Sequence, residues 1–417
     1  MNEKIIDHLF RHQFGKMVSV LTRIFGLEHI ELIEDAVQDT FIKALKVWPN
    51  NAPENTEAWL MTAAKNRTLD LFRKYKSDSN KHIKFASGPA SLNLSELFLD
   101  HEIDDSQLRM IFTACHPLLD NKEQIAFALK TIGGFSIPEI GTALMIKPET
   151  IKKRLQRSRK KIRQEHISFS IPIGKELNDR LQRVLEVMYL IFNEGFHSSK
   201  QEILVRKDLC GEAIRLVKLI LKKPSLRQPD VYALFALMCF HSARLDSKIN
   251  ENNEIIDIRN QDRSQWYYPL IALGNEAMNK ALAIDQNLSI YHYEAAIASE
   301  HLRAASFVAT NWSIILEWYL KIYKSNPSSV ALLNIAIVNL QLGKTETALE
   351  TLQDIDVSQL AQRSYLFYGA FAEYYFIKKE YDLAIRDIDK ALDHVQNNSE
   401  KEYLKNKKQQ YIRNSLD

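Results

Sequence analysis

A strongly basic segment runs from Lys147 to Arg163, with nine Lys and Arg side chains and one acidic side chain. Cationic side chains displace counterions from phosphates, and Arg, Lys and Gln can bind base edges in the major groove of DNA. Apolar residues recur at helical spacing inside the segment, so the cationic side chains cover the rest of one helix. The candidates for DNA contact are Lys152, Lys153, Arg154, Gln156, Arg157 and Arg159. A solvated helix face usually mixes both signs of charge, which this one does not.

The residues before the basic segment predict how it is held. Ser136 and Glu139 have the S-x-x-E spacing of a capping box, which starts a short helix. The turn falls at Met145 to Lys147, and Pro148 suits the first position of a second helix, where its missing amide needs no partner. The expected buried residues are Ile140, Leu144, Ile151, Leu155 and Ile162. Together these features predict a helix-turn-helix with a basic recognition helix.

Patterns for catalysis and metal binding are weak. The sequence has no phosphate-binding loop, nucleophile elbow, dinucleotide fingerprint or HExxH motif, so no enzyme activity and no cofactor are predicted. His8 and His12 are four residues apart, which could chelate a metal, but no third ligand accompanies them. We therefore expect an ordinary helix face there and no metal site.

One segment in the C-terminal half leaves two alternatives open. Asp262, Arg263 and Trp266 either bind a ligand or partner, or form a buried ion pair capped by the aromatic ring. The sequence alone does not decide between them. Cys115 and the two residues that follow it are expected to be structural.

The composition predicts an all-helical protein. Only 12 Gly and 11 Pro occur in 417 residues, whereas sheet proteins need frequent turn residues. The net charge of +3 is small, so the local basic segment carries the argument for nucleic acid. The three cysteines lack the spacing of a disulfide framework or zinc ribbon. The longest apolar run, Val231 to Phe240, is about half a membrane span, and the N-terminus lacks the apolar core of a signal peptide. We expect a soluble cytoplasmic protein.

Hydrophobic periodicity divides the chain into four expected parts. In chain order they are helices at 1–76, a linker at 77–104, the helix-turn-helix part at 105–170 and a long helical region at 171–417. Within the last part, residues 329–355 align with residues 365–392 at an offset of 36. This pattern resembles tetratricopeptide repeats, with any antiparallel pair of helical hairpins as the alternative.

Several segments resemble one known family. Residues 33–49 (IEDAVQDTFIKALKVWP) and 58–74 (AWLMTAAKNRTLDLFRK) look like region two of bacterial sigma factors of the extracytoplasmic-function group of the sigma-70 family. Residues 135–162 (FSIPEIGTALMIKPETIKKRLQRSRKKI) look like region four, in the family's order. MYLIFNEGF at 188–196, NQDRSQW at 260–266 and the repeats resemble the subgroup with a long C-terminal tetratricopeptide-like extension.

The resemblance implies contacts with core RNA polymerase. One acidic helix face would dock on the coiled coil of the β′ subunit, and the β flap would be a further contact of the polymerase. The implied polymerase-binding residues are Asp35, Gln38 and Asp39. Taken without the resemblance, such a face is also typical of a solvated surface.

The resemblance also implies contacts with promoter DNA. The loop 49–57 and the helix 58–76 correspond to the parts that capture a flipped base of the minus-ten element and hold the melted strand. Phosphate contacts are implied for Lys65, Arg67, Arg73 and Lys74. Base contacts are implied for Asn55, Asn66 and Trp59, although core positions are favoured for both Trp59 and Trp48. At minus-thirty-five, base reading is implied for Lys152, Lys153, Gln156 and Arg157, and phosphate contact for Arg154 and Arg159.

The preferred hypothesis is a sigma factor that directs promoter-specific initiation, with a C-terminal repeat domain that regulates it through a protein partner or through an intramolecular contact. The sequence departs from the family pattern at Met145, where Gly is common, and at Gly141, where Ala is common. One rival is a one-component regulator whose repeats sense a ligand or protein. A second rival makes the C-terminal region an enzyme or cofactor-binding domain, which the absent phosphate loops disfavour.

Overall fold

The computed structural model describes residues 3–48, 52–79, 100–144, 146–196, 205–250, 255–285 and 287–416. Within these ranges the regular elements are all helices, and the only strand-like pairing is one antiparallel bridge between Ile249 and Ile255. The all-α prediction is therefore confirmed. Among the described helices, none has the length and apolar content needed to cross a membrane.

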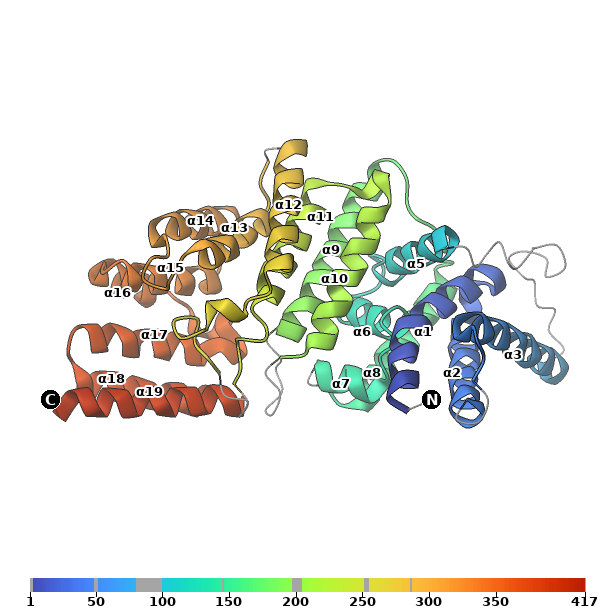
Figure 1. Cartoon of the computed structure of the whole chain (residues 1–417), viewed down its shortest axis with the longest axis horizontal. Helices are drawn as coiled ribbons and strands as arrows, with labels where there is room; N and C mark the ends of the chain where they lie inside the picture. The colour runs from blue at the N-terminus through green and yellow to red at the C-terminus, as the bar shows by residue number, and fades with distance from the viewer. Residues whose placement is uncertain are drawn as a thin grey trace. The chain divides into compact units, whose positions relative to one another are not determined.

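The chain forms two compact units, Met1–Ile191 and Phe192–Asp417, and the boundary falls inside one helix. The helices of the first unit are labelled in Figure 1. They are α1 (Glu3–Phe25), α2 (Ile30–Val47), α3 (Thr56–Ser79), α5 (Asp100–Ala114), α6 (Asn121–Thr131), α7 (Ile137–Ala143), α8 (Pro148–Gln164) and the start of α9 (Lys175–Phe196), with a short 3₁₀ helix η1 (Leu27–His29) before α2.

Helices α1, α2 and α3 share a hydrophobic core. Phe14, Leu21, Ile33 and Leu60 are all completely buried in it. Gly26 ends α1 with a φ of 98°, a conformation that glycine adopts without strain, and this lets the chain turn directly into η1 and α2. The periodic apolar residues of the sequence therefore build the region expected at the N-terminus.

The helix-turn-helix forms as the capping signals predict. Ser136 and Glu139 make a reciprocal capping box at the start of α7, and Pro148 occupies the first turn of α8. Four of the five residues expected to be buried are buried, namely Ile140, Ile151, Leu155 and Ile162. The fifth, Leu144, is half-buried at the end of α7. Met145, in the predicted turn, lies outside the described residues, as do residues 80–99 of the predicted linker.

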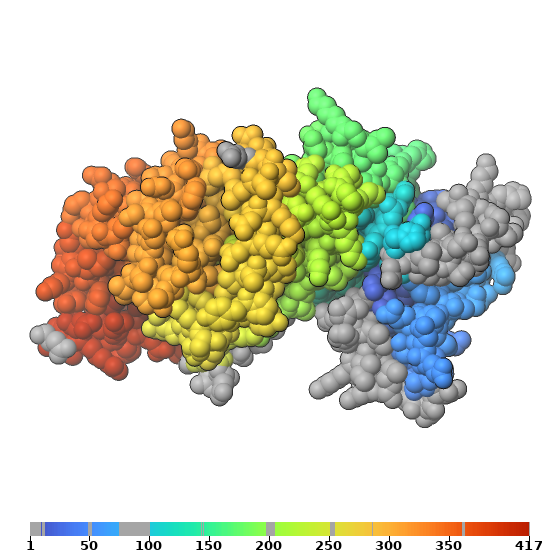
Figure 2. Space-filling view, turned by 45° about the horizontal axis from the view of Figure 1, so that its top comes forward, coloured from blue at the N-terminus to red at the C-terminus, as the bar shows by residue number. Residues whose placement is uncertain are grey.

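The second unit is a series of helix pairs (Figure 1), and Figure 2 shows the surface of one face of the molecule, coloured along the chain. After α9 it contains α10 (Lys207–Lys222), η2 (Pro224–Leu226), α11 (Pro229–Ala243), η3 (Arg263–Gln265), α12 (Tyr268–Ile284), α13 (Ile290–Arg303), α14 (Trp312–Ser325), α15 (Ser329–Gln341), α16 (Thr345–Gln353), η4 (Val357–Arg363), α17 (Ser364–Ile377), α18 (Tyr381–His394) and α19 (Asn398–Leu416). Pairs α15/α16 and α17/α18 are the two repeats aligned in the sequence.

The two repeats match in packing and in backbone conformation. Ala348 and Ala384, which the alignment superimposes, are both fully buried where paired helices touch. The turns also match, because Gly343 has a φ of 72° and Lys379, 36 positions later, has a φ of 63°. Only the first of these turns has a glycine, which adopts this left-handed conformation without strain. The repeat pattern read from the sequence thus corresponds to a repeated structure.

The NQDRSQW segment is a structural connection. The Arg263 guanidinium donates to the carbonyl oxygens of His301 and Ala304, at 2.7 and 2.9 Å, and lies over the Trp266 ring. These carbonyls end α13, where a cation satisfies unpaired acceptors. Asp262 is exposed and instead caps η3 by accepting from Ser264. Of the two alternatives left open by the sequence, the buried ion pair is not formed between Asp262 and Arg263, although the Trp266 ring does cover the guanidinium.

Candidate nucleic-acid interface

Helix α8 presents most of its predicted DNA-binding residues to solvent. Its apolar side packs on α6 and α7, so the opposite side is free to enter the major groove of DNA. The exposed predicted base-reading residues are Lys152, Lys153, Gln156 and Arg157. None of them makes an ion pair with another residue in the described part of the chain. Arg154 is half-buried beside them.

Arg159 points to a different surface. Its side chain is only 12% exposed and donates to Glu31 Oε1 at 3.0 Å and to Glu34 on α2. Glu34 is buried, and this burial raises its pKa despite the adjacent guanidinium. The predicted phosphate-contacting Arg159 is therefore held by two carboxylates of the region expected to bind polymerase.

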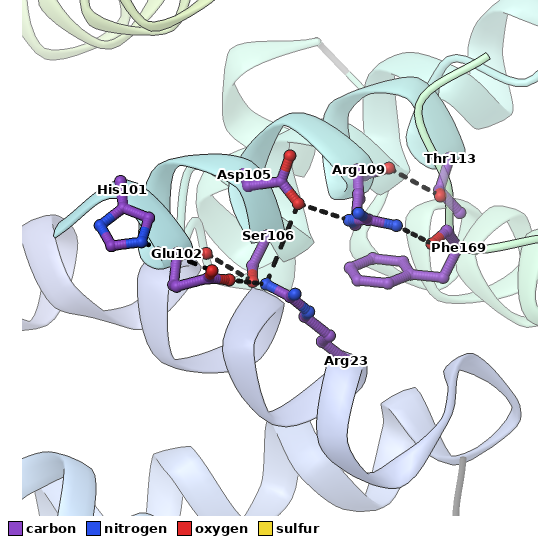
Figure 3. Close-up of polar contacts among 8 residues, drawn as sticks. All are labelled: Arg23, His101, Glu102, Asp105, Ser106, Arg109, Thr113 and Phe169. Carbon is purple, nitrogen blue, oxygen red and sulfur yellow. Dashed lines mark hydrogen bonds and ion pairs between the residues drawn. The ribbon is translucent and has the colours of Figure 1, made fainter. Parts of the chain in front are cut away.

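Further contacts join the helices of the predicted region two to those of region four. Arg23 on α1 forms ion pairs with Glu102 and Asp105 on α5, and Asp105 also accepts from Arg109 at 2.7 Å (Figure 3). Gly15 lies so close to the end of α6 that an added Cβ would come within 2.0 Å of the Ile132 carbonyl oxygen. The two parts thus pack against each other in one unit.

A groove of about 720 Å³ lies between α2 and α3. Asp39 and Arg67 face each other in it, with an Arg67 Nη2 to Asp39 Oδ2 distance of 2.7 Å and an Nε bond of 2.8 Å. One residue was expected to bind polymerase and the other DNA, so the structure brings the two predicted sites together. The groove is also lined by Lys43 and Lys46, for which the resemblance to the family implies no binding role.

The remaining predicted minus-ten residues lie along α3. Asn66 and Trp59 line the groove, and Trp59 contacts the fully buried Trp48 edge to face at 5.4 Å. Asn55 has a structural role that sequence reasoning missed, since its side chain accepts from the Ala58 amide and caps α3. Arg73 pairs with Asp70 at 3.1 Å. Lys74 is exposed and Lys65 half-buried.

The other predicted polymerase-binding residues lie beside these carboxylates on α2. Asp35 and Gln38 are exposed. Partial burial, with the nearby Glu31 as a second cause, raises the Asp35 pKa. Residues 49–51 of the predicted base-capture loop lie outside the described residues. Glu34 was missed although it interrupts the apolar stripe of α2, and a carboxylate on a buried stripe is a signal for a paired cation.

Sequence models of protein families match both N-terminal parts. The model named Sigma-70 region 2 matches residues 9–77, and the model named Sigma-70, region 4 matches residues 109–162. Residues 180–282 match a family described as one of unknown function. The first two matches coincide with α1 to α3 and with α5 to α8, which carry the candidate interface.

Relatives of known sequence agree with these matches. An uncharacterized protein of Rhizobium meliloti (strain 1021) is 30% identical over 81% of this chain and 80% of its own length. The ECF RNA polymerase sigma factor SigE of Mycolicibacterium smegmatis is 27% identical over 38% of this chain and 60% of its own. The ECF RNA polymerase sigma factor SigW of Bacillus subtilis is 26% identical over 36% of this chain and 82% of its own length. No solved structure matches significantly. The chain belongs to the extracytoplasmic-function group of the sigma-70 family and carries a long helical C-terminal extension.

Proposed function

We propose that this protein binds core RNA polymerase and directs initiation at a specific set of promoters, without catalysing a reaction itself. The observation that carries the proposal is the exposed polar and basic face of α8, held by a capped helix-turn-helix. On that face, Lys152, Lys153, Gln156 and Arg157 read bases at minus-thirty-five. Arg154, half-buried beside them, contacts phosphates, and so does Arg159, whose side chain is paired with Glu31 and Glu34 of α2 in this structure.

The first three helices supply the other two contacts. On α2, Asp35, Gln38 and Asp39 dock on the basic β′ coiled coil, which the exposure of Asp35 and Gln38 and the negative charge of the two aspartates support. On α3, the groove-lining Trp59, Asn66 and Arg67 hold the melted minus-ten strand together with Lys65, Arg73 and Lys74. Asn55 joins this surface at the capped start of α3.

The test is run-off transcription with core polymerase and promoter fragments selected from genomic DNA. The full chain should direct defined start sites, and Lys153→Ala/Arg157→Ala should abolish them while still co-purifying with polymerase. Asp35→Asn/Gln38→Ala should instead lose co-purification. Operator binding by a chain that never binds polymerase would favour the one-component regulator and contradict this proposal.

We infer that the C-terminal unit regulates this activity. It has its own buried core, and its helix pairs form a groove of about 340 Å³ lined by residues of α12, α13 and Trp318 of α14, which is suited to a peptide or protein. A chain ending at Phe196 is the appropriate comparison, since Arg180 of α9 donates to the Phe112 carbonyl oxygen at 2.6 Å within the first unit. Equal transcription by the short and full chains would contradict the regulatory role.

A further inference from the structure

The NQDRSQW segment lies where two helices of the second unit end. Helix α11 packs against α13. The backbone amide of Tyr267 donates to the Ala243 carbonyl oxygen at the end of α11, at 2.8 Å, and Arg263 donates to two carbonyl oxygens at the end of α13. These bonds place Arg263 and Trp266 beside both helix ends.

Four side chains at this junction each carry a buried nitrogen that has no hydrogen-bond partner in the part of the chain that the structure describes. The atoms are Nδ1 of His241, Nη2 of Arg263, Nε1 of Trp266 and Nδ1 of His301. The Trp266 side chain is only 3% exposed, so water has little access to its N–H group. Buried polar groups normally have partners, because an unpaired one is costly. Several such atoms in one place indicate that a bound molecule completes them.

Arg244, the first residue after α11, adds a charged donor to the junction. Its guanidinium lies over the Phe196 ring, 5.4 Å from the ring centroid, and makes no ion pair or hydrogen bond with any described residue. Burial lowers the pKa of Arg244 to about 10, and the Asp257 charge opposes this shift without pairing with the guanidinium. Asp257 instead accepts from the Tyr403 hydroxyl at 2.7 Å. Arg244 is therefore a charged group without a bound counterion.

Other cationic groups at the junction have structural partners. Lys248 donates to the Phe196 carbonyl oxygen at the end of α9, at 2.5 Å, and Nη1 of Arg263 binds the carbonyl oxygens at the end of α13. Helix ends leave such carbonyls without partners, so these bonds belong to the fold. The Arg244 guanidinium and the four buried nitrogens have no comparable acceptor among the described residues.

The charges around the two histidines are positive. Burial is the main cause that lowers the pKa of His301 to about 4, and the Arg244 and Arg263 charges lower it further. The pKa of His241 is also lowered, first by burial and then by Arg244 and Lys248. Among the described residues, no carboxylate opposes either shift. Water could accept from the neutral nitrogens, but it has no charge to compensate a guanidinium, whereas an anion does both.

We propose that η3 and the ends of α11 and α13 form a binding site for a small molecule with an anionic group, either a carboxylate or a phosphate. The anion accepts from the Arg244 guanidinium and from the unpaired nitrogens of Arg263 and Trp266, and a neutral His301 adds a further donor. Arg244, Arg263 and His301 are half-buried, so the ligand can reach them from solvent. The site lies within the second unit, and the inference does not depend on the proposed function.

The first experiment titrates the full chain with inorganic phosphate and, separately, with succinate, by isothermal titration calorimetry in chloride buffer of matched ionic strength. At least one of the two anions should bind to a single site with a dissociation constant below about 1 mM. The tighter of the two identifies the preferred anionic group. Heats no larger than those of added sodium chloride for both anions would mean that only water fills the site, and would overturn the proposal.

The second experiment repeats the titration with variants of the site. Arg244→Met keeps an unbranched side chain over the Phe196 ring but removes the charge, and it should weaken anion binding by about tenfold or more. Trp266→Phe keeps an aromatic ring beside Arg263 but removes the N–H donor, and it should weaken binding by about two- to tenfold.

A control variant separates these contacts from general charge attraction. Arg303→Gln removes an exposed cation at the end of α13 that pairs with Glu300. The anion affinity of this variant should equal that of the wild type, because Arg303 lies outside the proposed site. A loss in Arg303→Gln as large as in Arg244→Met would contradict the site.

Melting temperatures without added anion test for a purely structural role. Because the Arg244 charge has no counterion in the free chain, Arg244→Met should melt at the wild-type temperature or above it. A lower melting temperature with unchanged anion affinity would assign Arg244 to the fold alone and overturn the proposal. If both values fall, Trp266→Phe decides, since an unchanged affinity in that variant would also overturn it.

Discussion

Arg159 of α8 donates a charged hydrogen bond to Glu34 of α2, and 125 residues separate them in the sequence. Burial raises the Glu34 pKa, and the nearby Arg159 charge opposes this shift. Each residue therefore depends on the other, since a buried charge without a partner is costly. The pair fastens the recognition helix to the helix proposed to dock on polymerase.

Loss of Arg159 should destabilise the first unit. Arg159→Ala leaves Glu34 buried without its cation, and we expect a loss of about 3–5 kcal/mol in the free energy of unfolding. The measurement is denaturant unfolding of the full chain at pH 7. Arg157→Ala, one exposed residue on the same helix, should change stability little. Similar effects of the two variants on the free energy of unfolding would show that the ion pair between Arg159 and Glu34 does not stabilise the protein.

Gly141 explains a departure from the family pattern. A Cβ at this position would lie 2.7 Å from the Ile146 carbonyl oxygen, in the turn before α8. Gly141→Ala should therefore destabilise the helix-turn-helix by about 1–3 kcal/mol, despite the better helix propensity of Ala. Gly211 of α10 is the matched control, because nothing lies within 4 Å of its added Cβ. Gly211→Ala should stabilise by about 0.5–1 kcal/mol, as measured by calorimetry.

The two repeat turns should respond oppositely to exchange of their residues. Lys379 has a left-handed conformation that costs a non-glycine residue about 1 kcal/mol, while Gly343 adopts it freely. Lys379→Gly should raise the melting temperature of the second unit, and Gly343→Lys should lower it. Thermal unfolding followed by circular dichroism gives both values. A loss of stability in both variants would mean that the Lys379 side chain outweighs its backbone strain.

Lys248 should make the stability of the second unit rise with pH just above neutrality. Burial, with the neighbouring Arg244 charge as a second cause, lowers the pKa of Lys248 from 10.5 to about 7. At this residue the unfolded chain binds more protons than the folded chain above about pH 7, so Lys248 increases the free energy of unfolding as the pH rises. Burial also raises the pKa of Cys210 and Cys239 from 9.0 to about 12, which opposes this increase above about pH 9. Lys248→Met should therefore flatten the rise between about pH 7 and 8.5. An unchanged slope in the variant would assign the dependence to other groups.

Substitution of a base-reading residue of α8 should reduce sequence discrimination, whereas substitution of a phosphate-binding residue should reduce the affinity for all DNA sequences. Gln156→Ala should relax discrimination at one base pair by about 1–3 kcal/mol. Arg154→Ala should weaken all sequences equally and reduce the salt slope of binding by about 1. Competition binding with single-base variants of the minus-thirty-five duplex separates the two effects. The reverse pattern would exchange the assigned roles.

The sequence by itself determined the features that depend on neighbouring residues. Ser136 and Glu139 are three positions apart, so their capping box requires only local geometry. The scarcity of Gly and Pro and the helical spacing of apolar residues predicted an all-α chain for the same reason. The repeat offset was also visible, because each repeat folds by the same local pattern.

Only the tertiary structure decided which charged groups meet. Arg159 and Glu34, or Arg67 and Asp39, lie on different helices, and their side chains meet only after the cores form. The resemblance to the family implies DNA contacts for these arginines, because charge and spacing show what a side chain can bind. Its partner in the folded chain depends on helix packing over long sequence separations, for which one sequence holds no local signal.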